Sequence, residues 1–460
     1  MTMRLFVFVF LWLALFPVQV QSGLLGDFSL QNELELGKKI TVQINRRFTL
    51  IYDPVITSYA QDIVDRLASH LPPQPFPFRV QVIVNPGLNA FAIAAGNVYI
   101  FTGLLLNAQH EAEIASVFAH EMGHVVHRHI AQNIERGSVA SLAAMLGLLA
   151  GAIVGGDGGS ALAIGSLAGA KSSMLHYSRE NEREADQAGF NLLLKAGYPP
   201  EAMVQIFEKM RKLSWLGENS FPAYLSTHPG LDERIGTISS RINQLEQEGK
   251  KQPYNDKTFL RIQALVRARY ADPDKALVHF QGIPQPGDME ILATGIVLSR
   301  LNRIQDAQPF FSRALEMKPD DSLFLREAGR FLFEYKDAQT QALDLLSRAV
   351  QLNADDFLAR FFLARVRAEK GDHLQAIEEM KRVLREVPYD WEVHSYLGRY
   401  YGARKEYFHA HLHLASSFFY REKEDKAHFH LQEARKRAKS DNEKKAIEDC
   451  LSAWEMWKGI

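Results

Sequence analysis

Apolar and polar positions divide the chain into three parts. Residues 5–16 (LFVFVFLWLALF) are wholly apolar. Between about residues 30 and 245, β-branched and aromatic runs flank the turn signal Gly96-Asn97 and predict a strand pair, and an apolar stretch from Ile114 to Ala119 follows. Residues 246–258 (EQEGKKQPYNDKT) replace this pattern with polar side chains, which indicates a domain boundary. The pattern therefore predicts a leading segment 1–22, a domain 23–248 and a second domain 259–460.

The last part of the chain repeats itself. Alanines recur at intervals of 34 or 35 residues, at Ala307, Ala342, Ala376 and Ala410, and a second small or apolar residue follows each after seven positions. This is the tetratricopeptide pattern, in which each helix pair buries its face by stacking on its neighbours. It predicts an all-α, superhelical TPR domain whose concave face binds proteins. The candidate contacts there are Tyr396, Tyr400, Tyr401, Arg360 and Arg367.

Residues 1–22 have the features of a secretory signal. Arg4 precedes the apolar run, Pro17 ends it, and Ser22 offers a small residue for cleavage. No cysteine follows the run, which excludes a lipoprotein signal. An uncleaved anchor is the alternative, but twelve apolar residues fall short of the ~20 that span a bilayer. We expect export with cleavage near Ser22.

Composition narrows the class of protein further. In 460 residues, 47% are hydrophobic and 23% charged, which excludes wholesale disorder. The 53 basic and 54 acidic residues nearly cancel, so we expect no nucleic-acid partner. Cys450 is the single cysteine, which excludes an intramolecular disulfide and a cysteine metal cluster. We therefore expect the two domains to be held together by packing alone.

The strongest chemical signal is the segment His120-Glu121-Met122-Gly123-His124. On a helix the two histidines lie one turn apart on the same face, so both imidazoles can reach one metal ion. Zinc suits imidazole ligands and needs a third protein ligand. Glu121 adjoins the first ligand and is placed to polarise a water molecule at the metal.

A candidate third ligand lies downstream, in the segment 178–186 (SRENEREAD). In the metal interpretation Glu182 is the ligand, and Asp186, one turn further on, accepts a hydrogen bond from a ligand histidine. In the alternative interpretation the segment is a solvated acidic helix face, and Glu184 points elsewhere in either case. We expect none of the other nearby histidines to be ligands. His127 lies a further turn along, and His129 points to the opposite side, where with Arg128 it packs or forms a salt bridge. His110 and His176 lie at the surface or behind the ligands.

Two further segments leave alternatives open. Residues 139–170 carry long uncharged stretches around a glycine-rich centre, which predicts a buried helical hairpin beside the active site or, alternatively, contact with a membrane or an outer-membrane client. The strand pair around Gly96-Asn97 either presents a free edge that pairs with an extended substrate, or is wholly buried.

The motifs together resemble the gluzincin peptidases related to the CAAX-processing and HtpX proteases. Beside HEMGH and SRENEREAD, the resemblance rests on Asp53-Pro54 with Tyr59, on residues 89–105, and on His228-Pro229 with Arg234-Ile235. It implies an α+β gluzincin metallopeptidase domain holding one zinc ion, with His120, His124 and Glu182 as ligands. It also implies that Glu121 is the general base and Asp186 supports the site.

The role of His228 stays open. The resemblance implies a place near the metal, where His228 stabilises the oxyanion or occupies the open position of the zinc. The alternative is packing against the turn at Pro229.

A gluzincin domain followed by tetratricopeptide repeats is similar to the BepA-type periplasmic proteases. That resemblance implies a zinc metalloendopeptidase acting on misfolded or stalled outer-membrane proteins, with chaperone-like help in their assembly. It implies that the repeats dock on the β-barrel assembly machinery. The alternative is a TPR scaffold or chaperone with little proteolysis.

Overall fold

The computed structural model describes residues 28–136, 178–215, 224, 228–247, 256–335 and 338–458. The predicted signal (residues 1–22) and the predicted hairpin (residues 139–170) lie outside the described residues. Within the described parts, no helix combines the length and the apolar character needed to cross a membrane.

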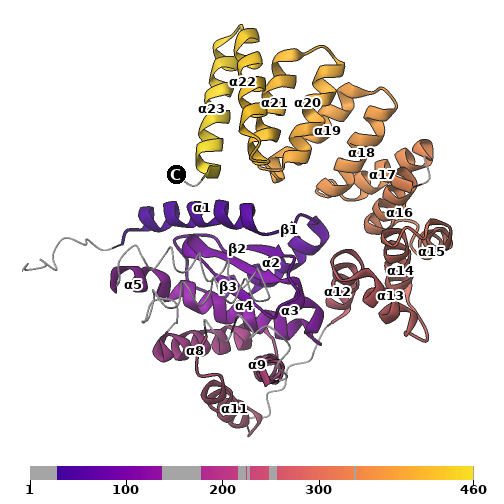
Figure 1. Cartoon of the computed structure of the whole chain (residues 1–460). Coiled ribbons are helices and arrows are strands. Elements are labelled where there is room, and N and C mark those ends of the chain that lie inside the picture. The colour runs from indigo at the N-terminus through magenta and orange to yellow at the C-terminus, as the bar shows by residue number, and fades with distance from the viewer. Residues whose placement is uncertain are drawn as a thin grey trace, which may run out of the picture.

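The first domain is built on a small mixed sheet with helices against it (Figure 1). Ser29 caps the first helix, and Asp53 with Pro54 begins the second, as residues of these types do at helix starts. The elements up to the sheet's last strand are α1 (Leu30–Arg47), β1 (Leu50–Ile51), α2 (Pro54–Ala68), β2 (Arg79–Ile83), β3 (Ala90–Ala92), η1 (Ala94–Gly96) and β4 (Asn97–Phe101). The strand order is β1-β2-β4-β3, with β2 parallel to β4 and the other pairs antiparallel.

The predicted strand pair around Gly96-Asn97 is confirmed. β3 and β4 pair antiparallel, with Phe91 opposite Tyr99, and β3 is an edge strand of the described sheet. Gly96 has φ +77°, and an added Cβ would lie 2.6 Å from the carbonyl oxygen of Pro77, so only glycine fits this turn.

The centre of this domain is α4 (Glu111–Val126), which carries HEMGH and is buried from Glu111 to His124. It follows α3 (Thr102–Asn107) and crosses α8 (Arg179–Ala196) very closely. A Cβ on Gly123 would lie 2.8 Å from the carbonyl oxygen of Ala185, so the absence of a side chain sets the spacing of the two helices. The remaining helices of the domain are α5 (His129–Arg136), α9 (Glu201–Trp215) and α11 (Leu231–Gln247).

Helix pairs make up the second domain, which confirms the repeat prediction. The recurring alanines Ala307, Ala342 and Ala376 are fully buried. The helices are α12 (Lys257–Tyr270), α13 (Pro273–Gln281), α14 (Asp288–Arg300), α15 (Ile304–Met317), α16 (Ser322–Tyr335), α17 (Gln339–Leu352), α18 (Phe357–Glu369), α19 (His373–Glu386), α20 (Trp391–Ala403), α21 (Tyr407–Tyr420), α22 (Glu424–Arg437) and α23 (Asp441–Lys458).

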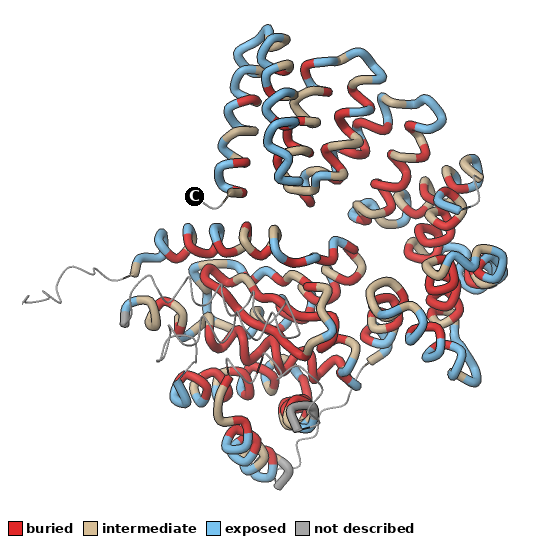
Figure 2. Tube along the Cα trace, viewed as in Figure 1, coloured by how far each residue is buried: buried red, intermediate tan, exposed pale blue. Residues whose placement is uncertain are grey.

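Three of the candidate contact residues are buried. Arg360 pairs with Glu379 at 2.5 Å, and Tyr400 and Tyr401 pack in the core of the repeats. These side chains lie on the inner sides of the helix pairs, so they stabilise the array and are not available to a partner. Figure 2 shows how such buried positions run along the inner sides of the helices.

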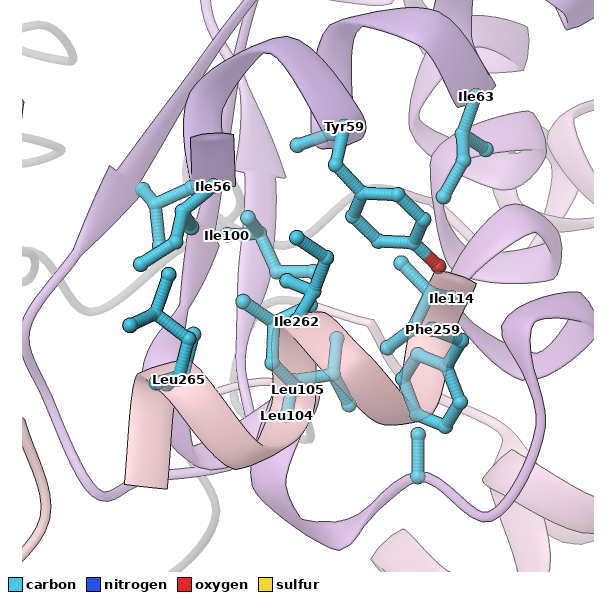
Figure 3. Close-up of a cluster of buried hydrophobic side chains, with 14 of the residues drawn as sticks. Ile56, Tyr59, Ile63, Ile100, Leu104, Leu105, Ile114, Phe259, Ile262 and Leu265 are labelled. Atoms are coloured by element: carbon cyan, nitrogen blue, oxygen red, sulfur yellow. The ribbon is translucent and has the colours of Figure 1, made fainter. Parts of the chain in front are cut away.

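The two domains share one core at α12. Phe259, Ile262 and Leu265 from this helix pack against Ile56 and Leu105 of the first domain (Figure 3). The array then curves away and returns, so that α23 lies against α1 (Figure 1). There Arg46 pairs with Glu422 at 2.6 Å, and Val42 packs in one cluster with Trp454 and Trp457.

The expectation that packing alone joins the domains is wrong. The fully buried Arg326 of α16 donates to both carboxylate oxygens of Asp53 at 3.0 and 2.6 Å, and to Asp356 at 3.0 Å. Asp53 caps α2 of the first domain and Asp356 caps α18 of the repeats. Glu327 lies against Arg326 as well and pairs with Arg269. A buried ion network therefore joins the start of α2 to the repeats.

Candidate metal centre

Two imidazoles meet at the centre of the first domain. Nε2 of His120 and Nε2 of His124 lie 3.0 Å apart, and both side chains are buried. Burial lowers the pKa of His124 well below its ordinary value, which keeps this imidazole neutral. Two buried ring nitrogens pointing at one another are the arrangement expected of ligands that share an ion.

Glu182 completes this group from α8. Ser178 begins that helix in a capping box with Asn181, and this start places the side chain of Glu182 toward α4. Its carboxylate lies 3.4 Å from Nε2 of His124 and 3.6 Å from Nε2 of His120. Burial alone would raise the pKa of Glu182, but His228, His124 and Arg234 outweigh it and lower the pKa, so the group is an anion.

Donor atoms of His120, His124, Glu182 and His228 all lie within 4.8 Å of one another. Three imidazole nitrogens and a carboxylate oxygen are a donor set that suits zinc. The residues present therefore fit a bound metal ion.

Asp186 lies behind the first histidine. Its Oδ1 is 2.9 Å from Nδ1 of His120, which holds the proton on Nδ1 and leaves Nε2 to face the cluster. Arg234 of α11 donates to both oxygens of Asp186 at 2.7 Å, and its guanidinium lies 2.6 Å from Glu182. One buried cation thus fixes two carboxylates. Arg234 stands in the motif with His228-Pro229, but the sequence alone does not predict this role for it.

Glu121 points into the same space. Its Oε2 accepts a hydrogen bond from the backbone N–H of Ala92 on β3 at 3.0 Å. Its Oε1 is buried and accepts no hydrogen bond from any described group. Burial raises the pKa of Glu121, while the nearby His228 and His120 oppose that rise. A carboxylate with a raised pKa, held at one oxygen and without a hydrogen bond from a described group at the other, is suited to taking up a proton.

His228 closes the cluster from the opposite side. Its Nδ1 lies 3.0 Å from Glu182 and 3.3 Å from His120, and its Nε2 lies 3.5 Å from Glu121. Tyr224 stacks on the ring, with the centroids 4.2 Å apart. The side chain therefore lies within reach of Glu182, His120 and Glu121.

His129 is also close, contrary to the expectation that it points away. Its Nδ1 lies 2.9 Å from Nδ1 of His124, and its Nε2 lies 2.9 Å from Glu184. The prediction assumed that helical spacing extends to His129. The helix α4 in fact stops at Val126, and Arg128 has φ +52°. That left-handed residue redirects the chain, so helical spacing no longer applies to His129.

The fold and this buried group define a metallopeptidase-type domain joined to a tetratricopeptide array. Residues 54–242 match peptidase family M48, and residues 292–355 and 340–390 match the tetratricopeptide repeat. The metalloprotease LoiP of Escherichia coli is 30% identical over 193 residues, which are 41% of this chain and 73% of LoiP. The chain belongs to peptidase family M48.

Two longer relatives match more of the chain. The beta-barrel assembly-enhancing protease of Escherichia coli is 33% identical over 223 residues, 48% of this chain and 46% of that protein. A Vibrio cholerae relative, also described as a beta-barrel assembly-enhancing protease, is 30% identical over 308 residues, 65% of this chain and 63% of that protein. The matches thus span about half to two thirds of these relatives' length.

Proposed function

We propose that this chain is a zinc-dependent endopeptidase that hydrolyses misfolded or stalled outer-membrane proteins. The observation that carries the proposal is the convergence of His120, His124 and Glu182 beside the half-open carboxylate of Glu121. Burying two imidazoles and a carboxylate together is costly unless the groups are paired or coordinate a metal, which favours a metal site here.

Each side chain has a task in this proposal. His120, His124 and Glu182 hold the ion, which supplies Lewis acidity to the scissile carbonyl when it is bound. Glu121 takes a proton from the attacking water through Oε1 and returns it to the leaving amine. Asp186, held by Arg234, keeps His120 in the tautomer that binds through Nε2.

The proposal allows two roles for His228. It either donates to the oxyanion or fills the open position of the ion while no substrate is bound. Alanine in its place lowers turnover in the first case and raises the basal rate in the second.

An extended substrate peptide could lie along β3. β3 is an edge strand, and its Ala92 N–H reaches Glu121 at 3.0 Å, so a peptide lying along β3 would pass beside the general base. Pairing through backbone groups tolerates many side chains, which favours unfolded or exposed segments as substrates.

Export and partners complete the proposal. The N-terminal pattern supports a secretory signal and a periplasmic location, and the names of the relatives support clients of β-barrel assembly. The repeats would bind the assembly machinery and its clients through their concave face. N-terminal sequencing of the protein from fractionated cells tests the cleavage near Ser22.

The second candidate is a TPR scaffold or chaperone with little proteolysis, favoured by the size of the array. Cleavage of an unfolded outer-membrane β-barrel protein separates the two. We expect Glu121→Gln to abolish cleavage while its zinc content stays equal to that of the wild type, and the exposed Glu180→Gln to leave both unchanged. Equal cleavage by wild type and Glu121→Gln would remove the assigned mechanism, and no cleavage by either would favour the scaffold.

A further inference from the structure

A second group of metal-binding side chains lies just outside the buried centre. His127 caps the C-terminus of α4, and His129 begins α5 after the left-handed Arg128. This turn brings the two imidazoles face to face, with ring centroids 5.5 Å apart and planes 13° from parallel. Two histidines two positions apart therefore present their nitrogens to the same side.

Glu184 of α8 faces these rings from the other side. Its carboxylate lies 2.9 Å from Nε2 of His129, and donor atoms of the three residues all lie within 4.8 Å of one another. The side chain of Glu184 is 44% exposed and His127 is exposed, whereas His129 is buried. Two imidazole nitrogens and one carboxylate oxygen, open to solvent on one side, suit zinc with water in its remaining position.

We propose that His127, His129 and Glu184 bind a second zinc ion, separate from the ion held by the buried centre. The hydrogen bond between His129 and Glu184 explains why those two residues lie together. It does not explain the stacked position of His127, whose ring nitrogen falls within reach of the same carboxylate.

The outer site adjoins the inner one at His129. His129 lies 2.9 Å from Nδ1 of His124, so the residue that supports an inner ligand is itself a ligand of the outer ion. Two dications held this close repel one another. An ion on Nε2 of His129 also displaces the proton that this nitrogen shares with Glu184, and the ring then carries its proton on Nδ1, where it opposes the Nδ1 proton of His124. Filling the outer site therefore weakens the inner site and slows catalysis.

Metal counting tests the site without any appeal to activity. The mature full-length protein is dialysed against buffers of fixed free zinc, and bound zinc is measured by mass spectrometry. We expect two ions per chain in the wild type, and one in His127→Ala and in Glu184→Gln at the same free zinc, with outer-site affinity lowered more than tenfold. His70→Ala, which removes an exposed histidine elsewhere, should keep two. A single ion in the wild type, or two in both variants, would overturn the proposal.

The effect on catalysis rests on the proposed function and is measured separately. Zinc beyond one equivalent should slow cleavage by the wild type and leave His127→Ala unaffected. If excess zinc slows both equally, the coupling through His129 is wrong. If neither protein cleaves at all, the proposed function fails, while the count of bound ions still decides whether the outer site exists.

Discussion

The network around Arg326 provides the sharpest test of how the domains are joined. Arg326→Met keeps most of the buried volume but removes the cation between Asp53 and Asp356, which lie 2.6 to 3.2 Å from it. Removing one partner of a buried ion pair costs about 3–5 kcal/mol, because the remaining charge stays buried without compensation. In a domain of this size each kcal/mol shifts the melting temperature by roughly 2–4 °C, so we expect a fall of about 10 °C.

The control is an ion pair of the same residue types at the surface. Arg348 pairs with Asp320 at 3.1 Å, with side chains 41% and 79% exposed, and such pairs contribute about 0–1 kcal/mol. Thermal unfolding followed by circular dichroism should therefore barely change in Arg348→Met. Adding Asp53→Asn and Asp356→Asn to Arg326→Met should recover part of the loss, since no unpaired charge remains. If Arg326→Met and Arg348→Met unfold at the same temperature, the network does not hold the domains together.

Four further outcomes are expected. Gly123→Ala puts a Cβ 2.8 Å from the backbone of Ala185, so α4 and α8 must separate; overpacking of this kind costs about 1–3 kcal/mol, and zinc affinity should fall in a metal titration. Arg234→Met removes the buried cation that Glu182 and Asp186 share, so the chelator-treated protein should lose more thermal stability than the zinc-loaded one, and equal losses would contradict the role of Arg234. Chelation of the wild type should stop cleavage and lower the melting temperature, and zinc should restore both, because the ion compensates the clustered donors. Burial lowers the pKa of His394 from 6.5 to about 4, so the folded state resists protonation: stability is complete above about pH 6.5 and falls by about 3 kcal/mol as pH drops toward 4, and His394→Gln should show a shallower decline in melting temperature over that window.

The parts of the fold that follow from short-range patterns were predictable. Asp53-Pro54 and the turn at Gly96-Asn97 specify a helix start and a hairpin locally, and the recurring alanines specify the helix pairs. The two histidine ligand candidates were predictable for the same reason, because a one-turn spacing on α4 places His120 and His124 on the same face of the helix.

What sequence reasoning missed depends on where the chain turns and on contacts between distant segments. The end of α4 and the left-handed Arg128 bring His129 back to His124, which a continued helix does not. Arg326 donates to Asp53, a helix-capping residue 273 positions away, and no periodic pattern in the sequence predicts that partner. Arg360 looked like a surface contact because charge predicts exposure, but Glu379 neutralises it inside the array.

The shared network at Asp53 limits how far the two halves can be treated as modules. A repeat array transplanted onto another peptidase would carry Arg326 into an interface that lacks its acceptor, unless the new host also begins the corresponding helix with an aspartate. A peptidase domain expressed alone would expose Asp53 and the apolar surface against which α12 packs to solvent. Truncation and domain exchange in this chain therefore need a matched pair of substitutions at the junction, with Asp53 and Arg326 changed together.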